Sequence, residues 1–355
     1  MYKWWHYLHA KTGSKRPLRL SLDETSVKFW PSARAGNLYV GFDSTRSRAK
    51  SASASRVTLQ DARCCMTHVA LICDDPAIQP LLPQVLICRK TSVRVHQVDA
   101  ISDLLPPNFK VLVTASAWTN ENIMLYIIGL LATALAPFTA TRQPILFMDT
   151  APSHLHASIV QKCYEKGVWL GLVPAGTTWA FQVLDTHCFG PFKQVLARRQ
   201  IDTRSRLGGE RLTIVQWIEC FVKAATTVLQ GVEWASAFDD NGFSRWDVPL
   251  RSELMKELAW EVLPPVNTEK PTLEDMKIVW PRTKRVPMST LENCFNHLPL
   301  APLALLGPPV VAAPALPGIT THMTPARRLR RKTSFAADHV PAAHVGSSAA
   351  ASSQE

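Results

Sequence analysis

The sequence predicts an α/β protein with a mixed sheet flanked by helices. Short apolar runs of strand length recur along the first 200 residues, and several of them end at an aspartate. The early runs follow one another with only turns between them, whereas later runs alternate with helix-length segments. That order is typical of a mixed sheet with helices on its faces.

The first half of the chain is rich in predicted strands. The segment 18–29 reads as a strand, and 37–42 is expected to be its hairpin partner because Pro31 and Gly36 signal a turn between them. Three more strands are predicted at 66–73, 84–88 and 110–114.

Helices and strands alternate in the next part. Asn120 is a suitable N-cap for a helix running to about residue 136. Gly167 is a suitable residue to end a second helix. The predicted elements are strands at 144–148 and 168–173, and helices at 153–166, from 186 onward, 212–230 and 250–262.

Four regions follow from composition. A basic N-terminal segment (1–17) precedes an α/β core (18–200), which carries a Ser/Ala/Arg-rich basic loop insertion at 43–56. A helical extension (201–297) leads to a Pro/Ala-rich tail (298–355) that is expected to be disordered and contains the basic cluster 327–332.

The positive charge lies at the two ends of the chain. The net charge is +11; residues 1–56 carry eleven Lys/Arg against three Asp/Glu, whereas residues 57–320 carry 23 of each. Basic ends on a neutral core favour a polyanionic partner, with nucleic acid first. That the termini serve only solubility is the competing interpretation.

Cysteine spacing and hydropathy indicate an intracellular protein without a membrane span. The eight cysteines form no CxxC pair and read as reduced thiols. The N-terminus has no uninterrupted apolar stretch typical of a signal peptide. The most apolar segment, 123–138, is shorter than the ~20 residues that a bilayer requires and is predicted to be a core helix.

Three aspartates stand where a two-metal nuclease needs them. Asp23 and Asp149 follow buried strand-like runs, and Asp185 comes 35 residues after Asp149, which leaves room for a helix, a strand and a turn. Carboxylates are the ligands that Mg²⁺ prefers. Two such ions can hold both the attacking and the leaving oxygen of a phosphodiester. For a single aspartate at a strand end, a turn or helix cap is the more ordinary role.

The ordered set of motifs resembles a known family. Asp23-Glu-Thr25, Trp118-Thr-Asn-Glu121 and Asp149-Thr-Ala-Pro-Ser-His154 resemble segments of the pogo/Tigger branch of mariner-type DDE transposases, whose catalytic core is RNase H-like. Val173–Thr178, Gln182–Asp185 and Pro191–Lys193 resemble the third motif of the same family. The match spans roughly residues 15–250.

Some positions depart from the family pattern. Thr150 stands where the family usually has Asn, and Val183 where it usually has Pro. Only 22 residues precede Asp23, so the family's N-terminal helix-turn-helix module is expected to be missing.

The resemblance implies a role for each site residue. Asp23, Asp149 and Asp185 would be the catalytic acids and would bind two Mg²⁺ (or Mn²⁺) ions. The candidates for DNA contact are His154, Lys193, Arg198 and Arg199. Glu24 is expected to point away from Asp23, because neighbouring strand residues face opposite sides, and Gln182 is a candidate support for the third acid.

The predicted function is that of a DDE-type transposase-derived endonuclease, located in the nucleus, that cuts and joins DNA. The alternative is a catalytically inactive, domesticated nuclear DNA-binding or scaffold protein, and a third candidate is an RNase H-like nuclease acting on RNA or hybrids. DNA is the expected partner, with no membrane. A homodimer and an import receptor bound through residues 327–332 are the further partners considered.

Overall fold

The computed structural model describes most of the first 297 residues. The described ranges are 1–29, 38–39, 55–56, 65–102, 105–174, 176–209, 211–244, 250, 252–262, 265–277 and 288–297. The predictions for most of the basic insertion, for the tail 298–355 and for its basic cluster 327–332 lie outside these residues.

A six-stranded mixed sheet forms the centre of the fold. Its strand order is β6-β5-β4-β1-β7-β8, with β4 antiparallel to both neighbours and the other pairs parallel. The strands are β1 (Arg16–Lys28), β4 (Cys65–Cys73), β5 (Gln84–Arg89), β6 (Phe109–Thr114), β7 (Arg142–Asp149) and β8 (Trp169–Val173). The α/β architecture predicted from the sequence, a mixed sheet flanked by helices, is confirmed.

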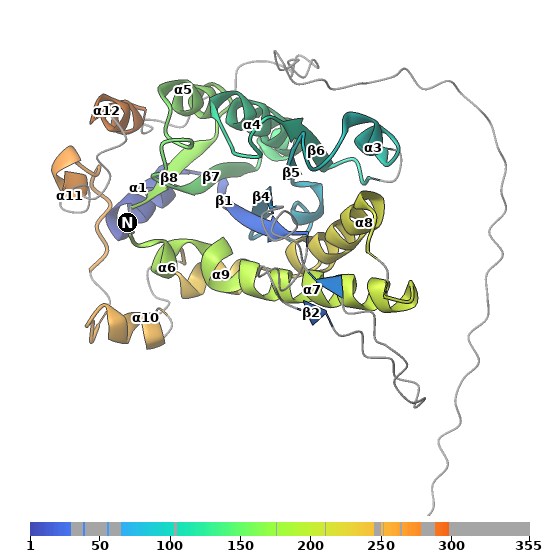
Figure 1. The fold of residues 1–355 in the computed structure, drawn as a ribbon. Coiled ribbons are helices and arrows are strands. Elements are labelled where there is room, and N and C mark those ends of the chain that lie inside the picture. The colour runs from blue at the N-terminus through green and yellow to red at the C-terminus, as the bar shows by residue number, and fades with distance from the viewer. Residues whose placement is uncertain are drawn as a thin grey trace, which may run out of the picture. The chain divides into compact units, whose positions relative to one another are not determined.

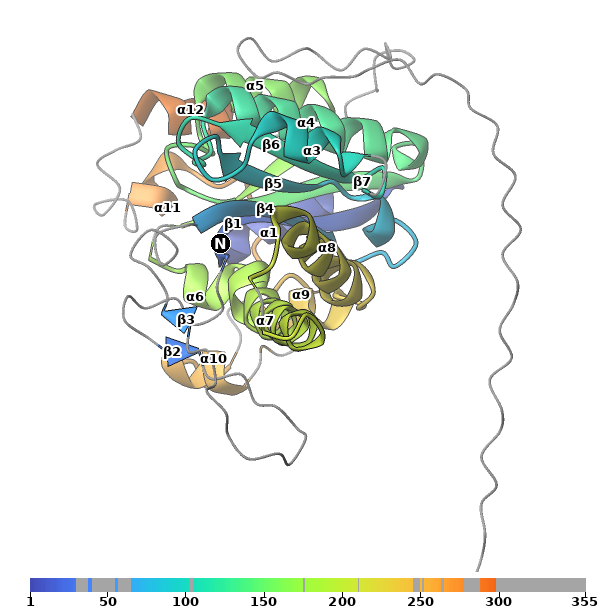
Figure 2. The same cartoon turned by 45° about the vertical axis from the view of Figure 1, so that its right-hand side comes forward.

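Helices cover both faces of the sheet (Figures 1 and 2). One face carries α4 (Glu121–Leu135) and α5 (Ala157–Glu165), and the other carries α7 (Phe189–Arg206), α8 (Ile214–Ala225) and α9 (Ala235–Asp240). The remaining helices are α1 (Tyr2–Lys11), α3 (Val95–Asp99), α6 (Thr178–Phe181), α10 (Ser252–Glu257), α11 (Leu273–Lys277) and α12 (Met288–Asn296). Short 3₁₀ and π turns complete the set: η1 (Gln79–Leu81), η3 (Ala136–Phe138), η4 (Leu184–Cys188) and η5 (Thr226–Gln230).

The predicted cap of α4 is present. The Asn120 side chain accepts a hydrogen bond from the backbone N–H of Ile123 over 3.0 Å. By length and composition, Glu121–Phe138 is the one segment among the described residues that would pass as a membrane span. Its apolar residues Ile123, Ile127 and Leu131 are buried in the hydrophobic core, which is the packing of a core helix.

One prediction about the N-terminal region is wrong, and it concerns the pairing of β1. The basic segment 1–17 contains helix α1, whose Trp5 ring lies 5.9 Å from that of Phe147 in β7 and is almost fully buried. Its aromatic side chains pack in the core although the segment is basic. The segment 37–42 is not the partner of β1; the short strand β2 (Leu38–Tyr39) pairs with β3 (Ser55–Arg56), and β4 pairs with β1 instead.

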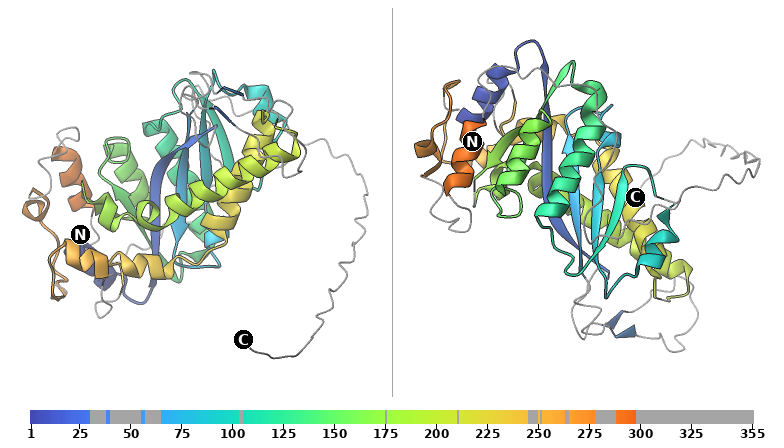
Figure 3. Two further views of the ribbon diagram at one scale, coloured as in Figure 1. Left: turned by 60° about the horizontal axis from the view of Figure 1, so that its bottom comes forward. Right: turned by 90° about the horizontal axis from the view of Figure 1, so that it is seen from above.

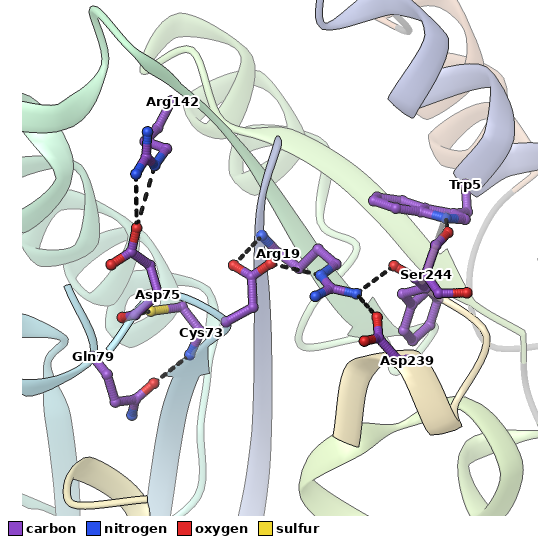
Figure 4. Close-up of polar contacts among 10 residues, drawn as sticks. Trp5, Arg19, Cys73, Asp75, Gln79, Arg142, Asp239 and Ser244 are labelled. Carbon is purple, nitrogen blue, oxygen red and sulfur yellow. Dashed lines mark hydrogen bonds and ion pairs between the residues drawn. The ribbon is translucent and has the colours of Figure 1, made fainter. Parts of the chain in front are cut away.

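A polar network joins the start of β1 to the helices around it (Figure 4). The Arg19 guanidinium donates to Asp74 through Nε over 2.6 Å, to Asp239 of α9, and to the Phe243 carbonyl over 2.6 Å. Close by, the Trp5 indole donates to the Ser244 carbonyl over 2.7 Å. These contacts join α9 and the residues after it to β1, and join α1 to Ser244.

The long central strand β1 determines where a site can form. It lies between β4 and β7 and extends well beyond the end of β7 (Figure 3). In a mixed sheet of this kind, the carboxyl ends of parallel strands offer the usual place for a binding site.

Candidate active site

Asp23 and Asp149 come from neighbouring parallel strands and lie on the same face of the sheet. Ser21 of β1 pairs with Phe147 of β7, and each strand carries its aspartate two residues later. Phe147 packs against Phe243 with ring centroids 4.0 Å apart. Because side chains two apart on a strand share a face, both carboxylates project to the side that α9 covers.

The third acid enters from the turn after α6. Asp185 lies in the π turn η4, where Leu184 and Cys188 are buried and anchor the segment in the core. The Gln182 side chain just ahead of it donates to the Leu22 carbonyl of β1 over 2.8 Å. This bond holds the third motif against the strand that carries Asp23, so the structure gives Gln182 a supporting position.

The pKa values show that the three carboxylates are electrostatic neighbours. Burial, with the charges of Asp185 and Asp149, raises the pKa of Asp23 to about 8. Partial burial and the Asp149 charge also raise the pKa of Asp185, which Lys193 partly offsets. A cluster of acids that repel one another in this way favours a bound cation or a proton.

His154 holds Asp149 in place. Its Nδ1 donates to Asp149 Oδ1 over 2.5 Å, and its Nε2 donates to Glu24 Oε1 over 3.1 Å. Burial alone would lower the pKa of His154, but the two carboxylates raise it to about 10. In turn, the His154 hydrogen bond and charge overcome the burial of Asp149 and lower the pKa of that carboxyl.

The acids fit a divalent cation in donor type and charge. They are three carboxylates, which are hard oxygen donors, and the raised pKa of Asp23 indicates an excess of negative charge at this point. Among the described residues, no group of three His, Cys, Asp or Glu side chains already stands close enough together to form a coordination shell.

The four candidates for DNA contact occupy different environments. His154 is buried, with 2% of its side chain exposed and both ring nitrogens bonded to carboxylates, so it is not the phosphate contact expected from the sequence. Lys193 and Arg198 are exposed on α7. Arg199 instead donates to the Thr227 hydroxyl over 3.0 Å, toward η5. Of the three cations, Lys193 is the one that acts on the pKa of Asp185.

The contribution of Glu24 was not predicted from the sequence. The strand alternation correctly puts it on the opposite face from Asp23, but that face is where the loop after β7 brings His154. Only the fold shows that a histidine can join the two faces around the end of β7. The spacing of five residues between Asp149 and His154 was the available signal.

The fold and these residues define an α/β protein with a mixed sheet and with acidic side chains that act on one another near the end of β7. Residues 67–237 match the sequence model of a family described as DDE superfamily endonuclease. That stretch includes Asp149 and Asp185 and begins after Asp23. The match supports the DDE family predicted from the motifs, and the pogo/Tigger branch stays a prediction.

One solved structure shows a likeness to this chain. It is the Mos1 transposase paired-end complex with the left transposon end, with 12% sequence identity and a TM-score of 0.30. The likeness covers 68% of this chain and 62% of that one, so this chain spans less than two thirds of the solved transposase. Comparison with curated proteins finds no match.

Proposed function

We propose that this protein is a DDE-type endonuclease of the transposase kind that cleaves DNA with divalent metal ions. The observation that carries the proposal is that Asp23 and Asp149 lie level on adjoining parallel strands, and that burial and the charges of Asp185 and Asp149 raise the pKa of Asp23. The pogo/Tigger branch is proposed on the motifs alone.

The chain's own residues would bind and orient the reactants. Asp23, Asp149 and Asp185 would hold one or two Mg²⁺ or Mn²⁺ ions. When bound, such ions would activate a water or a 3′-hydroxyl and stabilise the leaving oxygen. Lys193, beside Asp185, would contact a phosphate of the DNA backbone and so help to set its position.

The test is nicking of supercoiled plasmid by the purified chain in Mn²⁺ or Mg²⁺. Asp149→Asn keeps the shape of the side chain but removes the charge that binds a hard cation, so nicking should be abolished. Asp99→Asn, an exposed acid on α3, is the matched control and should nick like the wild type. Equal nicking by Asp149→Asn would refute the mechanism. No nicking by any of the three proteins would favour the domesticated, non-catalytic alternative.

A nuclear location is proposed on the basic cluster Arg327–Lys332 together with a DNA substrate. A fluorescent fusion of the full chain should accumulate in nuclei. Changing the five Arg and Lys residues of the cluster to Gln should abolish this accumulation, and nuclear accumulation of that variant would refute the role of the cluster.

A further inference from the structure

The His154 side chain is buried between two carboxylates. It is 2% exposed, its Nδ1 lies 2.5 Å from Asp149 Oδ1, and its Nε2 lies 3.1 Å from Glu24 Oε1. An ionised carboxylate only accepts hydrogen bonds, so both ring nitrogens donate. The imidazole therefore carries a positive charge, and burial of that charge is tolerated because each ring nitrogen is paired with a carboxylate.

The contact joins two strands across the sheet. Glu24 leaves β1 on the face opposite Asp23, and Asp149 ends β7 on the same face as Asp23. The chain turns back after β7, where the His154 N–H donates to the Ala151 carbonyl over 2.9 Å, and Leu155 is buried beside it. The loop thus brings the imidazole around the strand end to reach both side chains.

The two donors use the same oxygen of Asp149. His154 Nδ1 and the Ala151 N–H both bind Oδ1, over 2.5 and 3.1 Å. Within the described part of the chain, no hydrogen bond is made to the second oxygen, Oδ2. Asp23 is arranged in the same way, since its Oδ1 accepts from the Glu24 N–H over 2.7 Å. Each acid therefore has one oxygen tied to the protein and one directed elsewhere.

We propose that His154 and Glu24 are positioning residues that fix Asp149 so that Oδ2 is its metal-ligating oxygen. This inference rests on the proposed function of the site. It gives Glu24 a role through His154, and it replaces the phosphate contact expected of His154. Groups that orient a metal ligand through a hydrogen bond change metal affinity by about 10–100-fold when they are lost.

Two neutral replacements of His154 separate positioning from charge. In His154→Asn the amide nitrogen lies near the position of Nδ1 and can still donate to Asp149. In His154→Gln it lies nearer the position of Nε2 and can reach Glu24 instead. Both changes remove the same positive charge, so a difference between them reports the orientation of Asp149. Calorimetric titration of Mn²⁺ into each full-length protein should show binding to the Gln variant about 10–100-fold weaker than to the Asn variant.

A second pair of variants keeps the test decisive if a His154 variant fails to fold. Glu24→Gln keeps an acceptor oxygen for the imidazole, whereas Glu24→Ala removes it, and both remove the same negative charge. The Ala variant should bind Mn²⁺ about 10-fold more weakly than the Gln variant. His156→Asn, on an exposed histidine two residues along, should bind like the wild type.

The outcomes distinguish the inference from the function beneath it. If the wild type binds Mn²⁺ and Asp149→Asn does not, the metal site exists. Equal affinities within each matched pair would then overturn the positioning role alone. If the wild type does not bind Mn²⁺, or if Asp149→Asn binds it equally well, the proposed metal site and the inference both fall.

Discussion

Asp23 lies level with Asp149 on the adjoining parallel strand. Ser21 and Phe147 are registered across β1 and β7, and the two aspartates follow two residues later on the same face. Burial and the charges of Asp185 and Asp149 make ionised Asp23 unfavourable in the folded chain. The site is therefore a place where the protein gives up stability for a function, as binding and catalytic sites often do.

The metal-free protein should lose stability as the pH rises from about 6.5 to about 10. The pKa of Asp23 is about 8 in the folded chain against 3.8 ordinarily, and that of His154 is about 10 against 6.5. Between these values the folded state holds protons that the unfolded state has released, so stability falls with rising pH. The slope is at most about 1.4 kcal/mol per pH unit for each proton. Burial lowers the pKa of His68 to about 3 and also lowers that of His6, so these groups act in the opposite direction below about pH 6.5, and the lowered pKa of Asp149 does so only below about pH 4. The lowered pKa of the Met1 amino group offsets part of the fall up to about pH 8. Thermal melts in EDTA at pH 7, 8.5 and 10 measure the slope.

Asp23→Asn should make the metal-free protein more stable at pH 8. The amide cannot ionise, so the repulsion from Asp149 and Asp185 disappears, and a gain of about 1 kcal/mol would raise Tm by about 2–4 °C. Added Mn²⁺ should stabilise the wild type and leave the variant nearly unchanged. A lower Tm for Asp23→Asn than for the wild type at pH 8 in EDTA would contradict the proposed repulsion. Asp99→Asn controls for the loss of an exposed acid.

Gly171→Ala should destabilise the sheet. A Cβ at Gly171 of β8 would lie 2.5 Å from two ring carbons of Phe147, whose ring is stacked on Phe243 and fully buried. Overpacking of this kind costs about 1–3 kcal/mol.

Gly129→Ala is the matched control, since nothing lies within 4 Å of a Cβ there. In the interior of α4 it should stabilise the protein by about 0.5–1 kcal/mol. Urea unfolding of both variants decides, and an equal change in both would exclude the Phe147 contact as the cause.

The features of the fold and the site that could be predicted from the sequence are those that short segments of the chain determine. The order of strands and helices, the cap at Asn120 and the three acids are written in short segments, because apolar runs, turn residues and carboxylates act over a few positions. The positions of Asp23 and Asp149 follow once two adjoining parallel strands are assumed.

The missed features depend on contacts between distant segments. The partner of Trp5, Phe147 of β7, lies more than 140 residues later in the chain. The bond from His154 to Glu24 spans 130 positions. The pairing of β2 with β3 was missed because turn residues at Pro31 and Gly36 suggested a hairpin with β1, whereas β4 offers the longer apolar partner. Contacts between residues so far apart in the chain produce no periodic pattern in a single sequence, so they could not be predicted from it.

Arg19→Met should be among the most destabilising single changes at the start of β1. The guanidinium is 12% exposed and satisfies Asp74, Asp239 and the Phe243 carbonyl together. Removal of one partner from a buried ion pair costs about 3–5 kcal/mol, because the other charge is left unpaired. Arg142→Met breaks the more exposed pair with Asp75 and should cost about 1 kcal/mol. Chemical denaturation at pH 7 compares them. Similar losses in the two variants would mean that the Arg19 network is no more than a surface pair.

DNA binding by this chain should be strongly salt-dependent and nearly indifferent to sequence. The net charge is +11, and Lys193 is an exposed cation beside the acid cluster. Phosphate contacts release counterions, so affinity should fall steeply between about 50 and 200 mM salt.

Lys193→Gln should reduce the slope of log affinity against log salt by about 1. Arg199→Gln should change it less, because that side chain bonds to Thr227. Fluorescence anisotropy with several unrelated duplexes at four salt concentrations provides the measurement. A preference of about a thousandfold for one duplex would instead require a side chain that reads base edges in a groove.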